Sequence, residues 1–291
     1  MNLDWLQSFT QAAKQKSFSK AASVNNISQP ALSKQIQNLE SSLNVRLFHR
    51  TPTGITLTEA GQYFYNRIVP IMTELTVIRS DLQTFCRSTP VAIGSLPSLA
   101  TYYLPLRMKG FKFMDRSVSL MLQNTSSELL HSLREGRLDA VFIETEHTLD
   151  SLWRYELFKE PYYALFSLDH KYRSKNSVKL RELCEEPFIT HQAPCDLRNH
   201  IIHQIELIGY KPNIVSEVTF GDFIYGSVAS GIGITIIPEL LAKNINHPNL
   251  FSLPIVDFGR KRTISLITRD KNLGSTLYQY IKRPDQTDHT F

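Results

Sequence analysis

Residues 28–43 read SQPALSKQIQNLESSL, and this stretch decides the fold of the N-terminal part of the chain. Ser28 can cap a helix, and Pro30 lies in the first turn, where its missing backbone N–H costs nothing. The helix is predicted to run to about Leu43. Its inward face is expected to hold Ala31, Leu32, Ile36, Leu39 and Leu43, and its polar face Ser28, Gln29, Ser33, Lys34, Gln37 and Asn38.

Two shorter helices are predicted before this segment. Apolar residues recur at steps of three and four in the first of them, at Leu3, Leu6, Phe9, Ala12 and Ala13. Ser19 is expected to cap the second, over residues 20–24, and Asn25-Asn26 is typical of a turn. Two helices joined by a short turn, the later one with a polar face, predict a helix-turn-helix.

The residues that follow predict a short two-stranded ribbon. Arg46-Leu-Phe-His-Arg50 and Thr51-Pro-Thr-Gly-Ile-Thr-Leu57 would form its strands, with the turn near Gly54. A ribbon directly after a helix-turn-helix is the wing of a winged helix. The N-terminal domain is therefore expected to span residues 1–58.

A long helix is predicted over residues 59–88, with Thr58 as its cap. Its apolar residues alternate at steps of four and three, at Phe64, Ile68, Ile71, Leu75, Ile78, Leu82 and Phe85. This heptad seam favours pairing with a second copy of the chain, and the alternative is packing on its own domain. Pro70 is expected to kink the helix or leave a local break.

Positive charge is concentrated at the N-terminus. Residues 1–58 carry six Lys or Arg against Asp4 and Glu40, a net charge of +4, whereas residues 89–291 carry 23 basic and 22 acidic residues. A compact basic region on a nearly neutral body is typical of a polyanion binder. The alternative is chance, because short segments often reach this charge.

The rest of the chain, residues 89–291, alternates predicted strands and helices. Strands are expected at 91–94, 118–122, 138–143, 162–166, 188–189, 215–218, 232–236 and 264–267, and helices near Ser98 and at 127–133, 196–208 and 222–230. This pattern predicts parallel sheet covered on both faces and two α/β lobes with a cleft between them. We expect lobe I at about 91–160 and 266–291 and lobe II at about 161–265, which makes the chain α/β overall.

Several classes of protein are excluded or disfavoured. The chain has 291 residues, 42% hydrophobic and 20% charged, and lacks a run of about 18 apolar residues that could span a membrane. Three cysteines without CxxC spacing (Cys86, Cys184 and Cys195) and an N-terminus without an apolar core favour a cytoplasmic protein. Nucleotide-binding glycine motifs, GxSxG and HExxH are absent, and His200 with His203 is a poor metal site. No enzyme activity, cofactor or metal is expected.

The N-terminal segments together resemble the signature of LysR-type transcriptional regulators. They are Phe9, Ser17-Phe18, Ala21-Ala22, residues 28–36, Leu39-Glu40, Leu47-Phe48-His-Arg50 and Leu57-Thr-Glu-Ala-Gly61. Weaker similarity continues at Ile93-Gly94, Leu104-Pro105, Gly136-Arg-Leu-Asp139, Glu186-Pro-Phe-Ile189 and 231–238. The resemblance implies a homotetramer, winged heads on promoter DNA and a small-molecule cleft in a periplasmic-binding-protein-like domain. RNA polymerase is a further candidate partner.

The helix over residues 28–43 would then enter the major groove of DNA. There Gln29 can pair with adenine, Pro30 can contact a thymine methyl group, and Lys34 can serve bases or phosphates. The full set of candidates is Ser28, Gln29, Pro30, Ser33, Lys34, Gln37, Arg50, Thr51 and Thr53. The alternative is a merely hydrated helix face and loop.

The resemblance places effector binding near the strand ends of the C-terminal domain. Matching hydroxyl positions are Ser95, Ser98, Thr125, Ser126 and Thr190, and His191 and Phe220 are expected to line the cleft and favour a ring. Hydroxyls with helix N-terminal amides suit carboxylates, so the expected effector is a small acid or an aromatic compound. The alternative is that these residues are ordinary helix caps.

Two other functions remain as alternatives. Pro194-Cys-Asp-Leu-Arg198 resembles the region of peroxide-sensing family members that holds their reactive cysteine, with a basic residue near Cys195. The second cysteine of those proteins lies about nine residues on, where this chain has Gln204, and Cys184 lies upstream instead. The other alternative is a ligand-binding protein or an enzyme of the same two-lobed fold that does not bind DNA.

Overall fold

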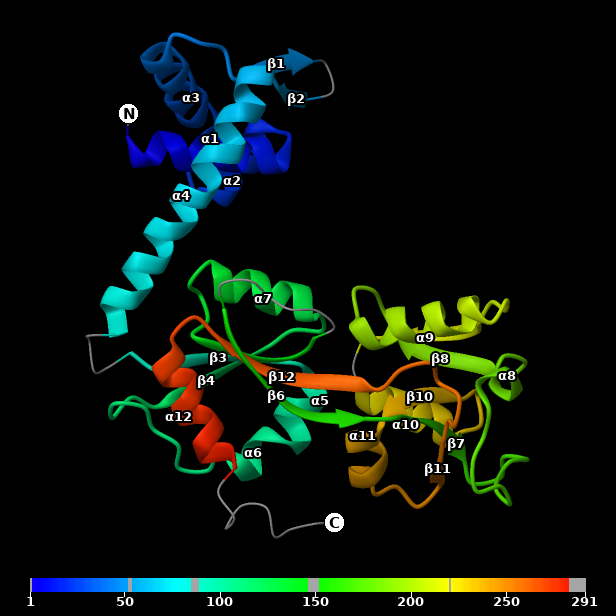
Figure 1. Ribbon diagram of the computed structural model, residues 1–291. Helices are drawn as coiled ribbons and strands as arrows, with labels where there is room; N and C mark the ends of the chain where they lie inside the picture. The colour runs from blue at the N-terminus through cyan, green and yellow to red at the C-terminus, as the bar shows by residue number, and fades with distance from the viewer. Residues whose placement is uncertain (1, 52–53, 85–88, 146–151, 220, 283–291) are drawn as a thin grey trace. The chain divides into compact units, whose positions relative to one another are not determined.

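The computed structural model describes residues 2–51, 54–84, 89–145, 152–219 and 221–282. The chain divides into two compact units, unit 1 over residues 1–85 and unit 2 over residues 86–291. Unit 1 holds four helices and a short ribbon, and unit 2 holds an α/β fold (Figure 1).

Three short helices form the head of unit 1: α1 (Leu3–Gln15), α2 (Phe18–Val24) and α3 (Gln29–Leu43). The Ser28 side chain accepts a hydrogen bond from the Ala31 amide, which confirms the predicted start of α3. Ser19 was the wrong cap for α2. Ser17 has the extended backbone of a capping residue and accepts from the Lys20 amide, so the helix begins earlier.

The core of the head is formed where α1 and α3 face each other. Phe9, Leu32, Ile36 and Leu39 are buried there. Two residues predicted to face inward do not. Ala31 is exposed because it lies about 100° around the helix from Leu32, and Leu43 is exposed because it ends α3 beside an open groove.

The ribbon of β1 (Phe48–Thr51) and β2 (Gly54–Leu57) is antiparallel and pairs Thr51 with Gly54. A Cβ atom at Gly54 would lie 2.7 Å from the Lys16 carbonyl oxygen, and the φ of +143° there also favours glycine. The ribbon predicted as a wing is therefore confirmed, packed closely against the end of α1.

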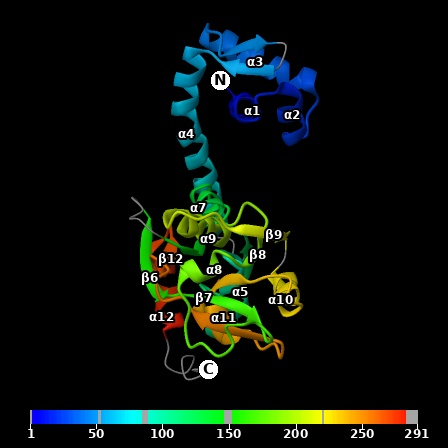
Figure 2. The ribbon, with the colours of Figure 1, turned by 90° about the vertical axis from the view of Figure 1, so that its right-hand side faces the viewer.

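Helix α4 (Glu59–Thr84) runs without interruption through Pro70, so a break at this residue is wrong (Figure 2). Its first turns pack on the head, where Ile68 is 4% exposed. Farther along, the seam is open to solvent, with 41 to 62% exposure at Ile71, Leu75, Ile78 and Leu82. Phe85, the last predicted member of the seam, lies outside the described residues.

Lobe I of unit 2, defined here as residues 89–160 and 262–282, is built on a five-stranded sheet in the order β4-β3-β5-β12-β6. The strands are β3 (Val91–Ser95), β4 (Val118–Leu122), β5 (Ala140–Glu144), β6 (Trp153–Glu160) and β12 (Arg262–Thr268). Its helices are α5 (Pro97–Tyr102), α6 (Leu104–Arg107), α7 (Ser126–Arg134) and α12 (Lys271–Ile281).

Lobe II, residues 161–261, contains a three-stranded sheet and a strand pair. The order β10-β7-β11 is antiparallel, and β8 pairs with β9 in parallel. The strands are β7 (Tyr162–Ser167), β8 (Pro187–His191), β9 (Asn213–Val218), β10 (Thr235–Pro238) and β11 (Leu250–Pro254). The helices are α8 (Leu180–Leu183), α9 (Asp196–Leu207), α10 (Gly221–Ala229) and α11 (Glu239–Asn244).

The predicted parallel sheet is wrong in part. β3 is parallel to β4 and to β5, but β12 is antiparallel to both of its neighbours, β5 and β6. The chain leaves lobe I along β6 and returns along β12, and a strand that returns must run in the opposite direction. These two paired strands extend side by side toward lobe II (Figure 1).

Candidate functional sites

One face of α3 presents the predicted DNA-contacting side chains. Ser28, Gln29, Pro30, Lys34 and Gln37 are exposed, and Ser33 is half-buried. Positions three and four apart lie on the same side of a helix, so the six side chains form a single polar face opposite the buried Leu32, Ile36 and Leu39. Seven of the nine predicted DNA-binding residues are thus exposed, five on α3 together with Arg50 and Thr51 of the ribbon, and Ser33 is half-buried.

The positive charge of the head is uncompensated. Among the described residues, no ion pair reaches Lys14, Lys16, Lys20, Lys34, Arg46 or Arg50. The Glu40 carboxylate instead accepts hydrogen bonds from the amides of Leu47 and Phe48, at 2.7 and 3.2 Å. Basic side chains without an acidic partner give the surface of the head a positive electrostatic potential, which attracts a polyanion.

The ribbon contributes two described candidates. The Arg50 guanidinium lies 5.5 Å from the centre of the Phe18 ring, a cation–π contact that helps to hold this exposed charged group in place. The Thr51 hydroxyl donates to the Gly54 carbonyl oxygen at 3.1 Å and so helps to close the turn. Thr53 lies outside the described residues.

A cavity of about 460 Å³ lies between the two lobes of unit 2. From lobe I it is lined by Leu96, Pro97, Ser98, Thr101, Tyr102, Leu122, Asn124, Glu144 and Arg262. From lobe II it is lined by His191, Cys195, Asp196, Leu197, Thr219, Gly221, Tyr225, Pro238 and Leu241. This volume and mixture of polar and apolar side chains suit a small molecule.

Only some of the predicted effector residues reach this cavity. Ser98 and His191 line it. Burial lowers the pKa of His191 below its ordinary value of 6.5, which keeps the imidazole neutral near neutral pH. Phe220 lies outside the described residues.

The other four predicted hydroxyl residues lie outside the cavity lining. Ser95 is buried and donates to the Leu96 carbonyl oxygen at 3.0 Å, and Thr125 caps α7 and donates to Glu128 at 2.7 Å. Thr190 is buried within β8. The Ser126 hydroxyl is buried without a hydrogen-bond partner among the described residues. None of the four lines the cavity, and Thr125 is the one that fits the alternative of an ordinary helix cap.

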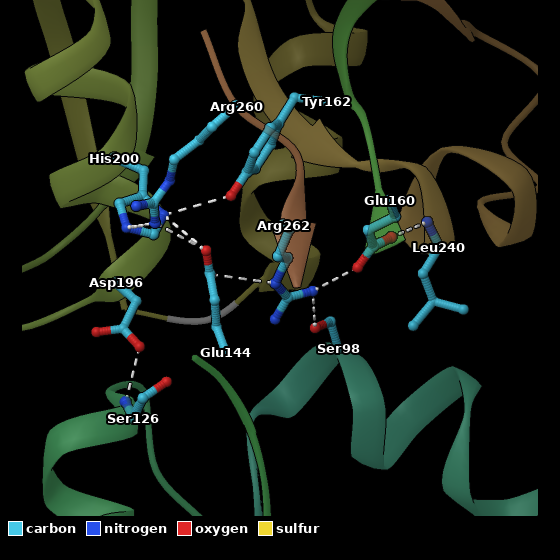
Figure 3. Close-up of polar contacts among 10 residues, drawn as sticks. All are labelled: Ser98, Ser126, Glu144, Glu160, Tyr162, Asp196, His200, Leu240, Arg260 and Arg262. Carbon is cyan, nitrogen blue, oxygen red and sulfur yellow. Dashed lines mark hydrogen bonds and ion pairs between the residues drawn. The ribbon is translucent and has the colours of Figure 1, made fainter. Parts of the chain in front are cut away.

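A buried charged network forms one wall of the cavity, centred on Arg262 at the start of β12 (Figure 3). Its Nη1 lies 2.9 Å from Glu160 Oε1 and 3.2 Å from Ser98 Oγ, and its Nε lies 3.4 Å from Glu144 Oε2. Burial raises the pKa of Glu160, and the neighbouring Arg262 opposes that rise. Arg260 binds the other oxygen of Glu144 at 3.1 Å.

The sequence interpretation missed the charged residues of this wall and Asp196. A local signal existed for two of them, because Glu144 directly follows the buried run of 140–143 and Arg262 begins the strand that contains Ile264–Ile267. A charged residue at the end of a buried strand must find a partner or water. Which partner it finds depends on contacts between residues more than 100 positions apart, such as Arg262 with Glu160.

Cys195 is a buried thiol at the N-terminus of α9. Burial raises its pKa, and the nearby amides of Leu197 and Arg198 oppose this effect only in part. The Arg198 guanidinium is paired with Glu217 at 2.6 Å. This environment disfavours the thiolate that a peroxide sensor needs. Cys184 is also buried, and its thiol donates to the Leu180 carbonyl oxygen.

Two features are absent from the described residues. No cluster of three or more His, Cys, Asp or Glu side chains is arranged to bind a metal ion. No described helix has the length and hydrophobicity needed to cross a membrane.

Comparison with known proteins links both units to one family. Residues 3–62 match the family described as "Bacterial regulatory helix-turn-helix protein, lysR family", and residues 87–280 match "LysR substrate binding domain". The uncharacterized HTH-type transcriptional regulator YybE of Bacillus subtilis is 31% identical over 82% of this chain and 83% of its own. The DNA-binding transcriptional dual regulator OxyR of Escherichia coli is 26% identical over 92% and 90%.

A solved structure supports the same relationship. Full-length BenM is 26% identical, with a TM-score of 0.56 over 97% of this chain and 95% of its own. The two family matches together cover most of the chain, and the relatives are regulators rather than enzymes. The chain therefore belongs to the LysR family of DNA-binding transcriptional regulators.

Proposed function

We propose that α3 and the β1–β2 ribbon deliver this regulator to promoter DNA, and that a small molecule in the cavity of unit 2 modulates the binding. The observation that carries the proposal is the exposed polar face of α3, on a head whose basic side chains form no ion pair with an acid among the described residues. Gln29 and Pro30 lie in the first turn of α3, and first-turn residues of a recognition helix meet base edges. We infer that the protein acts in the cytoplasm, where the promoter is.

A gel-shift assay with the full chain and the promoter beside its own gene tests this function. Lys34→Ala should weaken binding several-fold and reduce the slope of log affinity against log salt by about 1 per head on the DNA. Gln29→Ala should relax discrimination at one base pair instead. Lys112→Ala removes an exposed lysine of unit 2 and serves as the matched control.

The expected pattern separates phosphate contacts from base contacts. A wild-type chain that binds no promoter fragment at low salt would contradict the proposed function. Equal weakening of Gln29→Ala on all DNA sequences would contradict base recognition by that residue, and a Lys112→Ala effect as large as that of Lys34→Ala would contradict binding through α3.

We infer that the partner in assembly is a second copy, paired along α4, and that two such dimers form a tetramer. Support comes from Ile71, Leu75, Ile78 and Leu82, which keep the steps of four and three and are exposed within unit 1. Apolar side chains on one helix face are stabilised when a matching helix covers them.

Redox sensing through Cys195 is less well supported than ligand binding. The relative OxyR is similar over most of its length, but here the thiol is buried with a raised pKa and no cysteine stands at Gln204. Ligand binding requires only the cavity that the lobes enclose.

A further inference from the structure

A carboxylate that lines the cavity, Asp196, already binds the N-terminus of a neighbouring helix. Asp196, the first residue of α9 in lobe II, reaches the N-terminus of α7 in lobe I. Its Oδ2 accepts a hydrogen bond from the Ser126 amide at 2.7 Å (Figure 3), and its own amide donates to the Asn124 carbonyl oxygen at 3.2 Å. Helix N-terminal amides attract anions, and Asp196 already occupies the Ser126 amide that could otherwise attract the carboxylate of a ligand.

The cationic side chain of the cavity is also committed to acids of the chain. Arg262 is the only Lys or Arg among the described residues that line the cavity. Its guanidinium is paired with both Glu144 and Glu160. Arg260, behind Glu144, is paired with the same carboxylate. His191 is neutral near neutral pH because burial lowers its pKa. An incoming acid would therefore compete with internal carboxylates for Arg262.

The charge of the lining favours the opposite sign of ligand. Glu144 and Asp196 supply two negative charges against the one positive charge of Arg262, so the described lining has a net charge of −1. Like charges in a partly desolvated cavity repel strongly, and opposite charges attract. Oδ1 of Asp196 has no donor among the described residues and can accept a hydrogen bond from a ligand.

The remaining lining suits an apolar or aromatic body. Tyr102 and Tyr225 come from opposite lobes, and leucines complete the wall, namely Leu96, Leu122, Leu197 and Leu241. Tyrosine rings attract cations through their faces, and leucine side chains favour hydrocarbon. The volume of about 460 Å³ limits the ligand to a small molecule.

We propose that this cavity selects a small organic amine, protonated at neutral pH and attached to an apolar or aromatic body, and that Asp196 determines this selectivity. Its carboxylate keeps acids away from the α7 N-terminus and receives the ammonium group. The inference deepens the proposed function, because it takes the cavity as the effector site, and it replaces the small acid that the sequence favoured.

Thermal unfolding of the full chain with three matched probes tests the selectivity. Benzylamine, benzyl alcohol and benzoate share a ring and differ in charge. The amine should raise the Tm of the wild-type chain most, because a ligand that binds the folded state stabilises it. An equal shift with the alcohol, a larger shift with benzoate, or no shift with benzylamine would overturn the proposal.

Variants of Asp196 assign the effect to this residue. In Asp196→Ala the α7 amides are freed, so benzoate should gain a Tm shift that the wild-type chain lacks, and benzylamine should bind about tenfold more weakly. A gain of binding cannot arise from a damaged fold. Asp196→Asn keeps the shape of the side chain but removes its negative charge, so this variant should lose only the preference for the amine.

Glu206→Ala removes an exposed carboxylate from the same helix and should leave all three probe responses unchanged. Failure of benzoate to gain binding in Asp196→Ala would overturn the role of Asp196. The gel-shift assay of the wild-type chain is a separate readout. A chain that binds promoter DNA yet prefers benzoate refutes this inference alone, whereas a chain that binds no DNA refutes the proposed function.

Discussion

Arg262 and Glu160 lie 2.9 Å apart, and their side chains are only 8% and 3% exposed. Burying such a pair costs desolvation energy that hydrophobic residues of similar size would avoid. The pair holds together β6 and β12, the two strands that connect the lobes, and Ser98 of the cavity wall accepts from the same guanidinium. We therefore interpret the network as fixing the geometry of the cavity wall rather than as adding stability.

His191 gives lobe II, on its side of the cavity, a dependence on pH. Burial lowers its pKa below 6.5, so the unfolded chain binds a proton at a higher pH than the folded chain. The stability that this residue contributes is complete above pH 6.5 and is lost as the pH falls through the lower pKa of the folded state. We expect His191→Gln to remove part of the fall in Tm on acidification, by a few degrees at most.

Scanning calorimetry of the full chain between neutral and mildly acidic pH measures this effect. His203→Gln, which changes an exposed histidine of α9, is the matched control. Wild-type and His191→Gln chains whose Tm values fall in parallel would show that the buried imidazole does not contribute.

Short helices and buried strands could be predicted from local sequence because their signals are local. Ser28 with Pro30 marked the start of α3, and spacing alone placed α9 and α10 to within a residue or two. The strand β6 was missed because its sequence, WRYELFKE, is rich in charge and only partly buried. The direction of β12 depends on the crossing between lobes, which no local pattern contains.

How far each candidate site could be predicted also depended on whether its residues lie close together in the sequence. The α3 face is one helix, so its period alone identified the exposed side chains. The cavity joins elements that are distant in sequence, and its two decisive contacts link Ser126 with Asp196 and Ser98 with Arg262. These pairs are 70 and 164 residues apart, beyond the reach of spacing or capping rules.

The exposed seam of α4 predicts that the chain assembles by pairing two copies of this helix. Leu75 is 41% exposed and lies at the middle of the seam between Ile71 and Ile78. If a second α4 covers Leu75, Leu75→Asp buries an unpaired charge between the two helices. This variant should raise the dissociation constant of the dimer tenfold or more.

Sedimentation equilibrium of the full chain gives this constant directly. Thr76→Asp adds the same charge one residue on, about 100° away from the seam, and should leave assembly nearly unchanged. Identical dissociation constants for the two variants, or a wild-type chain that is monomeric, would contradict pairing along α4.

Regulation of the intact chain requires a thermodynamic link between the cavity of unit 2 and the DNA-binding face of unit 1. A ligand that binds equally well to the free and DNA-bound chain cannot change DNA affinity, however tightly it binds. The lobes meet through Asp196 and Ser126, so a ligand that engages Asp196 acts on a contact between the two halves of the cavity. That contact gives the ligand a physical means of favouring one arrangement of the lobes.

Thermodynamic linkage makes the coupling between an amine and promoter DNA reciprocal. If an amine changes the affinity of the full chain for its promoter by some factor, promoter DNA must change the affinity for the amine by the same factor, typically 5- to 150-fold in such systems, about 1–3 kcal/mol. Titration of benzylamine with and without DNA, and of DNA with and without benzylamine, measures both ratios. Asp196→Asn should bring both ratios toward one while the chain without ligand still binds DNA. Unequal ratios would mean that the amine acts on a different oligomer from the one bound to DNA, and ratios of one in the wild-type chain would mean that occupying the cavity does not regulate.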